Sequence, residues 1–284
     1  MAFYLLPRSV YDMSVYLQYY KLREAPFNIT PDPRFLFFSR RHQEAFDHLL
    51  FGIRERKGFI QLTGEVGTGK TTVCRRLLEE LGPNYKTALI LNPFLTAGQL
   101  LRAIALELGL PTRRTDRLSI LHALNNFVLE QVNAGNDVVL LFDEAQNLTH
   151  ELLEQIRLLS NLETHSQKLL QICLIGQPEL RDKLADPSLR QLRQRITIRY
   201  HLSPLTRDET AEYINRRLSL AGANGTPRFD DGAVHRVYEY SGGVPRLINA
   251  VCDKALLAGF VKEQQVLMED LVKLAIDELQ GDHA

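Results

Sequence analysis

The stretch that decides the fold is Gly64-Glu65-Val66-Gly67-Thr68-Gly69-Lys70-Thr71, which matches the spacing G-x-x-x-x-G-K-S/T. The apolar run Phe59-Ile60-Gln61-Leu62-Thr63 comes directly before it and predicts a buried strand. Residues 72–81 place apolar side chains at helical spacing, so a helix should follow the loop. A strand, a glycine-rich loop and a helix start in this order direct backbone N–H groups at a polyphosphate. The stretch therefore predicts a nucleotide phosphate site.

Two side chains of this loop have expected contacts. Lys70 should reach the β- and γ-phosphates, and Thr71 should offer its hydroxyl to Mg²⁺. The predicted phosphate-binding residues are Gly64, Glu65, Val66, Gly67, Thr68, Gly69, Lys70, Thr71 and Thr72. A glycine-rich turn can also join a strand to a helix without a ligand, but the order of strand, loop, Lys-Thr and helix favours the phosphate site.

The composition is that of a globular protein without a charge preference. The 284 residues leave room for one large domain and a smaller one. Apolar residues make up 45% and charged residues 24%, and no run of 18 uncharged apolar residues predicts a membrane span. Lys plus Arg equal Asp plus Glu at 34 each, so no overall field attracts nucleic acid or anionic lipid. This balance argues against a protein dedicated to coating DNA.

The cysteines and the first residues bear on the compartment. Cys74, Cys173 and Cys252 lie far apart without metal-ligand spacing, so we expect buried thiols in a reducing cytosol and no structural zinc. Residues 1–13 lack a charged start, a useful apolar core and a small-residue cleavage site, so we expect no signal peptide. Met13 is an alternative start, because the organised sequence begins just after it.

An aromatic segment with three prolines, residues 16–41, precedes the first predicted helix. The prolines exclude one continuous helix. Phe27, Ile29 and Pro31 are candidates to line the adenine, and packing of these aromatic and apolar side chains onto the protein core is an equal alternative. Ser39 resembles the cap of the next helix.

Strands and helices alternate through the middle of the chain, which predicts a parallel sheet covered by helices. Further strands are expected at residues 87–91, 138–142, 169–175 and 196–202, with helices at 97–109, 119–132 and 151–162 between them. After Pro204 the pattern is all helical, with helices expected at residues 206–221, 230–240, 246–261 and 269–279. We therefore expect an N-terminal extension and linker over residues 1–41, an α/β core over 42–204 and a small helical domain over 205–284.

Two adjacent carboxylates, Asp143 and Glu144, end the strand predicted at residues 138–142. The carboxyl ends of the strands are where open α/β sheets bind ligands. Asp143 should hold Mg²⁺ through its water shell, and Glu144 should deprotonate the water that attacks the γ-phosphate. Gln177 follows the next strand and is a candidate sensor of the γ-phosphate or the water; capping of the Pro178 turn is the alternative. A strand that ends in Asp-Glu is common by chance, so this assignment depends on the phosphate loop.

Two clusters of arginines are candidates for phosphate contacts, although surface solvation explains most arginines. The clusters are Arg113, Arg114 and Arg117 in a predicted linker, and Arg190, Arg193 and Arg195 before the last predicted strand. For the first cluster a solvated loop is favoured over a phosphate or partner contact. The second cluster suits a contact from one subunit to its neighbour, because a guanidinium binds phosphate oxygens with a planar fork.

These motifs resemble the AAA+ ATPases over nearly the whole chain, and more narrowly the ATPase domain of the ExeA or general secretion pathway A family. The stretches that carry the resemblance are Leu22-Arg23-Glu24-Ala25-Pro26-Phe27, Thr30-Pro31-Asp32-Pro33, residues 63–72, Phe142-Asp143-Glu144-Ala145-Gln146-Asn147-Leu148, residues 175–180 and Gly243-Val244-Pro245-Arg246. The resemblance implies a three-layer αβα P-loop NTPase core with a five-stranded parallel sheet, followed by a small all-helical AAA+ lid. Fuller family members continue into a transmembrane helix and a peptidoglycan-binding part, so membrane anchoring and cell-wall binding do not carry over.

The resemblance also implies ligands and roles for single residues. ATP and Mg²⁺ are the implied ligands. The implied site residues are Lys70 and Thr71 in Walker A, Asp143 and Glu144 in Walker B, Gln177 as sensor 1, Arg195 or Arg193 as an arginine finger, and Arg246 as sensor 2 on the nucleotide.

We expect an ATPase whose nucleotide cycle drives assembly or operation of a bacterial envelope, secretion, pilus or exopolysaccharide complex. The expected partners are further copies of the chain and a protein of that complex. The expected location is the cytoplasm, with the inner face of the cytoplasmic membrane reached through the partner. The alternative is a DNA-associated AAA+ switch resembling replication initiators or transposition regulators, which is less favoured because no helix-turn-helix follows the lid. A helicase is disfavoured because the sequence has no second core domain.

Overall fold

The computed structural model describes residues 14–28, 35, 37–91, 94–112, 116–161 and 168–281. The chain divides into two compact units: a core unit, Arg40–Ser203, and a helical unit that joins Met1–Ser39 with Pro204–Ala284. The N-terminal residues, predicted as a separate extension and linker, thus group with the C-terminal helices. Ile29, Pro31, Arg113 and Arg114 lie outside the described residues.

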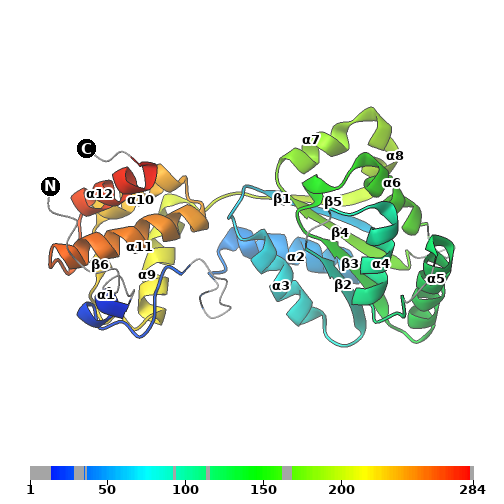
Figure 1. Cartoon of the computed structure of the whole chain (residues 1–284), viewed down its shortest axis with the longest axis horizontal. Coiled ribbons are helices and arrows are strands. Elements are labelled where there is room, and N and C mark those ends of the chain that lie inside the picture. Colours follow the sequence, from blue (N-terminus) through cyan, green and yellow to red (C-terminus); the bar gives the residue numbers. More distant parts are fainter. Residues whose placement is uncertain are drawn as a thin grey trace. The chain divides into compact units, whose positions relative to one another are not determined.

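A five-stranded parallel sheet forms the centre of the core unit, which confirms the predicted fold class (Figure 1). Its strands are β1 (Phe59–Gly64), β2 (Tyr85–Ile90), β3 (Asp137–Phe142), β4 (Leu170–Gly176) and β5 (Ile196–Leu202), in the order β2-β3-β4-β1-β5. All residues of β1 and β4 are buried, as expected for central strands. Exposed and partly buried residues alternate along β5, because this strand is an edge of the sheet.

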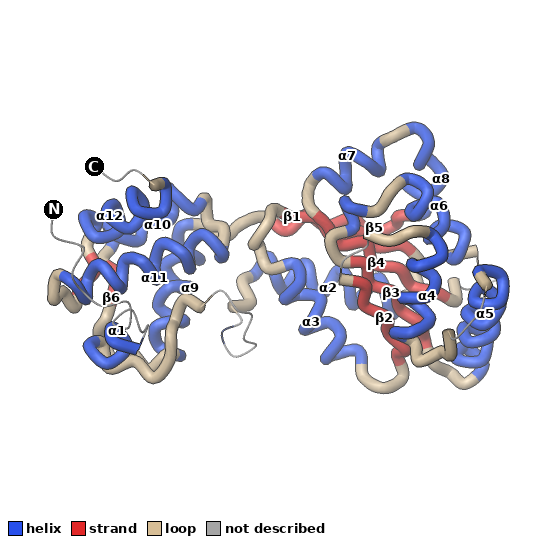
Figure 2. The backbone as a smooth tube through the Cα atoms, viewed as in Figure 1, coloured by secondary structure: helices blue, strands red, loops and turns tan. Residues whose placement is uncertain are grey.

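Helices cover both faces of the sheet (Figure 2). They are α2 (Arg40–Arg54), α3 (Lys70–Leu81), α4 (Ala97–Glu107), α5 (Arg117–Asn133), α6 (His150–Leu159), α7 (Glu179–Ala185) and α8 (Arg190–Arg195). The crossover from β1 to β2 runs across the sheet in the opposite direction to the later crossovers. Because such crossovers are right-handed, α3 lies on one face of the sheet and α4, α5 and α6 lie on the other. The three-layer αβα arrangement follows.

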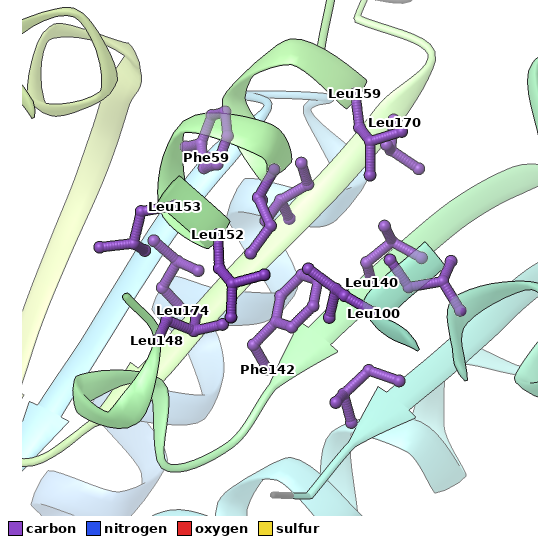
Figure 3. Close-up of a cluster of buried hydrophobic side chains, with 14 of the residues drawn as sticks. Phe59, Leu100, Leu140, Phe142, Leu148, Leu152, Leu153, Leu159, Leu170 and Leu174 are labelled. Carbon is purple, nitrogen blue, oxygen red and sulfur yellow. The ribbon is translucent and has the colours of Figure 1, made fainter. Parts of the chain in front are cut away.

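One apolar cluster lies between the sheet and the α4–α6 layer (Figure 3). Phe142 of β3, Leu174 of β4 and Leu152 of α6 belong to it. Leu148, just after the 3₁₀ helix η2 (Ala145–Asn147), is fully buried in the same cluster. The cluster therefore anchors the turn that follows β3, where the predicted carboxylates lie.

The helical unit contains α1 (Ser14–Tyr19), α9 (Arg207–Leu220), α10 (Asp231–Ser241), α11 (Pro245–Val261) and α12 (Glu269–Gln280). Thr206 forms a capping box with Glu209, and Asp230 caps α10. Two features were not predicted. A two-residue strand, β6 (Arg228–Phe229), pairs with β7 (Val266–Leu267), so the unit is helical apart from this short ladder. The second feature is helix α1, which ends before the first proline of the aromatic N-terminal segment.

The aromatic N-terminal segment packs into the core of the helical unit. Phe27 is 1% exposed and meets Phe229 edge to face at a centroid distance of 6.1 Å. The structure thus follows the packing alternative for Phe27, because a ring this buried cannot line an adenine. The buried guanidinium of Arg217 donates to the main-chain oxygens of Pro26 and Asn28 and so ties the segment to α9.

Candidate nucleotide site

The glycine-rich loop connects the buried strand β1 to α3, as predicted. Gly69 has a φ of 100°, in the left-handed region that favours glycine. A Cβ at this position would also lie 2.7 Å from the imidazole Nε2 of His42. Within the loop, the Thr68 hydroxyl donates to the Glu65 carbonyl over 2.8 Å. The side chains of Glu65 and Val66 are exposed, and the loop leads directly into the N-terminus of α3.

Lys70 is buried, with only 6% of its surface exposed. Its ammonium donates to the main-chain oxygens of Gly64 over 2.7 Å and of Glu65 over 2.8 Å. Burial lowers the pKa of this ammonium from its ordinary value, while the charges of Glu144 and Asp143 oppose the shift. A cation is thus held against the loop by neutral carbonyls that an anionic ligand can replace.

Thr71 and Asp143 meet beside the loop, as the sequence predicted for a metal site. The Thr71 hydroxyl donates to Asp143 Oδ2 over 2.7 Å, and the Glu144 N–H donates to Asp143 Oδ1 over 2.9 Å. Asp143 is 3% exposed. A hydroxyl and a carboxylate are hard oxygen donors, and Mg²⁺ is held by one or two such groups together with substrate phosphates. The donor set therefore fits Mg²⁺.

Glu144 and Gln177 also come together at this edge of the sheet. Phe142 of β3 is paired with Leu174 of β4 in the parallel sheet. The residues that follow these two strands therefore lie at the same edge of the sheet. The Gln177 side chain donates from Nε2 to Glu144 Oε2 over 3.1 Å. Glu144 itself has a φ of 52°, an uncommon backbone conformation for a residue other than glycine.

Three residues near this site were missed by the sequence analysis. His42 Nε2 lies 2.8 Å from the Thr68 oxygen. Gln146 donates to Glu144 Oε2, and Lys183 of α7 donates to the main-chain oxygens of Gln146 and Leu148. Gln146 could have been found from the sequence, because it stands two residues after the predicted carboxylate of Glu144. His42 and Lys183 had none, because only the tertiary fold brings them near.

The predicted arginine fingers do not reach the loop of their own chain. Arg193 and Arg195 lie on α8, directly before β5, whereas the loop follows the carboxyl end of the parallel strand β1. Arg195 Nη1 donates to the Ser160 hydroxyl over 2.7 Å. Arg193 is exposed and Nη1 lies 3.4 Å from the Ala185 oxygen. Arg246 is exposed in the first turn of α11 in the helical unit.

The cysteines and the other possible metal ligands do not form a second site within the ranges that the structure describes. Cys74, Cys173 and Cys252 are free and buried, as predicted, and burial raises the pKa of the Cys173 thiol to about 12. Among the described residues, no three His, Cys, Asp or Glu side chains gather as metal ligands. Over those same ranges, none of the helices has the length and apolar character that crossing a membrane requires.

Solved structures of similar fold cover most of the chain. The ORC2 protein of Aeropyrum pernix, in ADPNP and ADP complexes, matches with a TM-score of 0.64 and 21% identity over 90% of this chain and 71% of that one. Drosophila ORC bound to DNA matches with a TM-score of 0.68 and 18% identity over 96% and 67%. The RuvB Holliday junction branch migration motor of Thermotoga maritima gives 0.55 and 20% over 85% and 69%. At these identities the likeness shows the fold alone.

Sequence comparison is more specific. A family model described as an AAA domain matches residues 53–184. General secretion pathway protein A of Aeromonas hydrophila is 47% identical over 268 residues, which make up 94% of this chain. The chain spans 49% of the length of that relative. An uncharacterized HTH-type transcriptional regulator of Methanocaldococcus jannaschii is 30% identical over 37% of this chain and 26% of its own length. Over nearly its whole length the chain is therefore similar to general secretion pathway protein A, and residues 53–184 match the AAA domain family.

Proposed function

We propose that this protein binds ATP with Mg²⁺ and hydrolyses its γ-phosphate. The observation that carries the proposal is the meeting of Lys70, Thr71, Asp143 and Glu144 at the carboxyl edge of one parallel sheet. Two of these residues belong to the phosphate loop and two follow β3. This edge of a parallel sheet is where nucleotides bind in such folds.

The proposed roles follow from the chemistry of each group. The Lys70 ammonium exchanges its two carbonyl partners for β- and γ-phosphate oxygens, since a charged acceptor makes a stronger hydrogen bond than a neutral one. Thr71 and Asp143 would hold the Mg²⁺, which would neutralise phosphate charge. The N–H groups of residues 64–72 surround the phosphates from the other side.

Glu144 is proposed as the general base. Its Oε2 accepts hydrogen bonds from Gln146 and Gln177, while Oε1 accepts none in the part of the chain that the structure describes. Oε1 is then the oxygen that takes a proton from the attacking water. Gln177, whose amide donates to the same carboxylate, is the proposed sensor.

The proposal is tested by two substitutions that act on different steps. Lys70→Ala removes the cation of the loop and should abolish ATP binding. Glu144→Gln keeps the size of the side chain and the metal ligands, so ATP should bind while hydrolysis stops. Calorimetric ATP titration and phosphate release measure the two steps. A Glu144→Gln protein that hydrolyses ATP at the wild-type rate would remove Glu144 as the base.

We further propose that the nucleotide cycle drives assembly or operation of a bacterial envelope or secretion complex, from an oligomer in the cytoplasm that reaches the inner face of the membrane through a partner. The support is the identity of 47% to a general secretion pathway protein. Crosslinking in cells should recover an envelope-complex component with Glu144→Gln, which holds ATP, more strongly than with Lys70→Ala. Equal recovery from both variants would dissociate the partner from the nucleotide cycle.

DNA association is the second candidate that the sequence left open. The equal numbers of basic and acidic residues, 34 each, disfavour it. Binding of a DNA duplex measured against salt separates the two functions, because phosphate contacts make affinity fall steeply with added salt. Tight, salt-sensitive binding at 0.15 M salt would favour the DNA-associated switch.

A further inference from the structure

We infer that Gln146 is a positioning residue that fixes Glu144 for hydrolysis; the inference rests on the proposed function. The Gln146 amide lies between the ends of two neighbouring strands. Its Nε2 donates to Glu144 Oε2, and its Oε1 accepts from the main-chain N–H of Gln177 over 3.0 Å. One side chain thus links the proposed base after β3 to the proposed sensor after β4.

The two partners determine the orientation and the chemical type of this side chain. A backbone N–H can only donate, so the amide oxygen must face Gln177 and the NH₂ group must face the Glu144 carboxylate. A Glu at position 146 would keep the bond from the Gln177 N–H but would place a second carboxylate against Glu144. A Leu would make neither bond. A neutral amide of this length is therefore required.

The surroundings are shaped to hold the amide in place. A Cβ on Gly176 would lie 2.8 Å from Gln146 Oε1, so a glycine at the end of β4 leaves the necessary room. From α7, the Lys183 ammonium donates to the main-chain oxygens of Gln146 and, over 2.8 Å, of Leu148. Leu148 is fully buried in the apolar cluster of the core unit. The 3₁₀ helix that carries Gln146 is thus fixed at both its main chain and its side chain.

The two hydrogen bonds of the Gln146 amide matter because Glu144 is not part of a regular helix or strand. Its backbone is left-handed, with a φ of 52°, so local propensity does not favour the observed conformation. Both donors to its carboxylate, Gln146 and Gln177, bind the same oxygen, Oε2. Loss of Gln146 removes one of these two bonds and the link between the strands. The free oxygen Oε1 would then lose its fixed direction towards the water.

The test compares Gln146→Leu and Gln146→Glu with matched changes at the next residue, Asn147→Leu and Asn147→Asp. No hydrogen bond of the described chain involves the Asn147 side chain. Gln146→Leu should lower kcat by about 10- to 100-fold, as misplaced catalytic groups do. The Kd for ATP should stay within about twofold of wild type, because the loop and metal ligands are intact. The Asn147 variants should keep the wild-type kcat.

The split between kcat and Kd separates positioning from a general loss of structure. In Gln146→Glu the Gln177 N–H keeps its acceptor, but Glu144 loses the Gln146 donor and faces a second carboxylate. The kcat should therefore fall, while the Kd for ATP stays within about twofold of wild type.

Three outcomes decide the inference. A wild-type kcat in Gln146→Leu, or an equal loss in Asn147→Leu, would overturn it while leaving the proposed function intact. A wild-type kcat in Gln146→Glu would also overturn it. Wild-type hydrolysis by Glu144→Gln would overturn the proposed function itself, and with it any role for Gln146 in holding the base.

Discussion

The imidazole Nε2 of His42 lies 2.8 Å from the main-chain oxygen of Thr68, and it donates a hydrogen bond to the phosphate loop from the first turn of α2. The direction is fixed because a carbonyl only accepts. His42 is 4% exposed, and the same nitrogen lies 2.7 Å from the position that a Cβ on Gly69 would take. A residue outside the sequence motif thus supports the loop from within the core.

We predict that His42→Ala weakens ATP binding. The Thr68 oxygen would lose a buried partner, which costs about 1–3 kcal/mol and corresponds to about a 5- to 150-fold higher Kd if the cost falls on the nucleotide-binding conformation of the loop. His42→Gln, which keeps a donor, should recover part of the affinity. The exposed His122 on α5 provides the control, since His122→Ala should leave the Kd unchanged. Equal Kd values for His42→Ala and His122→Ala would contradict the prediction.

Thr71→Val should change the requirement for metal. The substitution keeps the shape of the side chain but removes the hydroxyl that contacts Asp143. We expect the Mg²⁺ concentration for half-maximal hydrolysis to rise about tenfold, the size of effect that losing one ligand interaction gives. Activity should return at high Mg²⁺. Thr87→Val in β2 is the matched control. The same Mg²⁺ dependence in both variants would exclude Thr71 as a metal ligand.

Arg217→Met should destabilise the helical unit. The Arg217 guanidinium is 7% exposed and donates to Pro26, Asn28 and the Tyr213 hydroxyl, so its loss leaves several buried acceptors unpaired. The expected loss in free energy of unfolding is about 3 kcal/mol, measured by urea titration. The neighbouring Arg216 is exposed, and Arg216→Met should change stability by about 0.5 kcal/mol or less. Similar unfolding midpoints for the two variants would show that the segment is held by its aromatic side chains alone.

The sequence was sufficient for the elements whose signal is local. The strands β1 to β4 were predicted from largely apolar runs. The strand β5, in which apolar and polar residues alternate, was predicted with its observed bounds. The loop was recognisable because its glycines and Lys-Thr pair stand at fixed spacing. The carboxylates were placed correctly because the ends of parallel strands share one edge of the sheet.

Tertiary partners could not be predicted in the same way. The sequence shows that Phe27 is apolar but not what it contacts. Contact with an adenine and packing onto the protein core were therefore equal alternatives. The amide of Gln146 has its partners at residues 144 and 177, and only the pairing of β3 with β4 brings these together. The short ladder of β6 and β7 joins two-residue segments that carry no strand pattern.

Arg246 is predicted to couple the helical unit to bound ATP. The family resemblance assigns it to the nucleotide, and it is exposed in the first turn of α11, so its guanidinium is available to phosphate oxygens. ATP should protect the wild-type protein from limited proteolysis, and Arg246→Ala should lose this protection. Arg207→Ala, at an exposed position in α9, should retain it. Unchanged protection in Arg246→Ala would show that this residue does not sense the nucleotide.

The last prediction is that full activity requires an oligomer in which one chain supplies Arg195 to the site of its neighbour. Within a chain, Arg195 precedes β5 at the edge of the sheet opposite to the loop, and the intervening strand β1 spans about 20 Å. Arg195 therefore cannot serve its own phosphates. Within the chain, Arg195 Nη1 donates to the Ser160 hydroxyl just after α6 and to the main-chain oxygen of Arg157. A cation added to the site in trans is worth about 10³ to 10⁵ in rate for phosphoryl transfer.

Mixing two inactive variants tests this arrangement directly. Arg195→Ala and Glu144→Gln should each be nearly inactive, but a mixed oligomer contains sites that pair an intact Glu144 with an intact Arg195 from the next chain. Mixing should therefore restore hydrolysis, and the specific activity of the wild type should rise with protein concentration. Mixing Glu144→Gln with Lys70→Ala should restore nothing, because both substitutions act on the same side of each site and leave no complete site. If Arg195→Ala keeps its activity while Arg193→Ala or Arg190→Ala loses it and is restored by mixing, the finger is a different arginine of α8. Flat specific activity over a wide concentration range and no restoration in any mixture would mean that the site is complete within one chain.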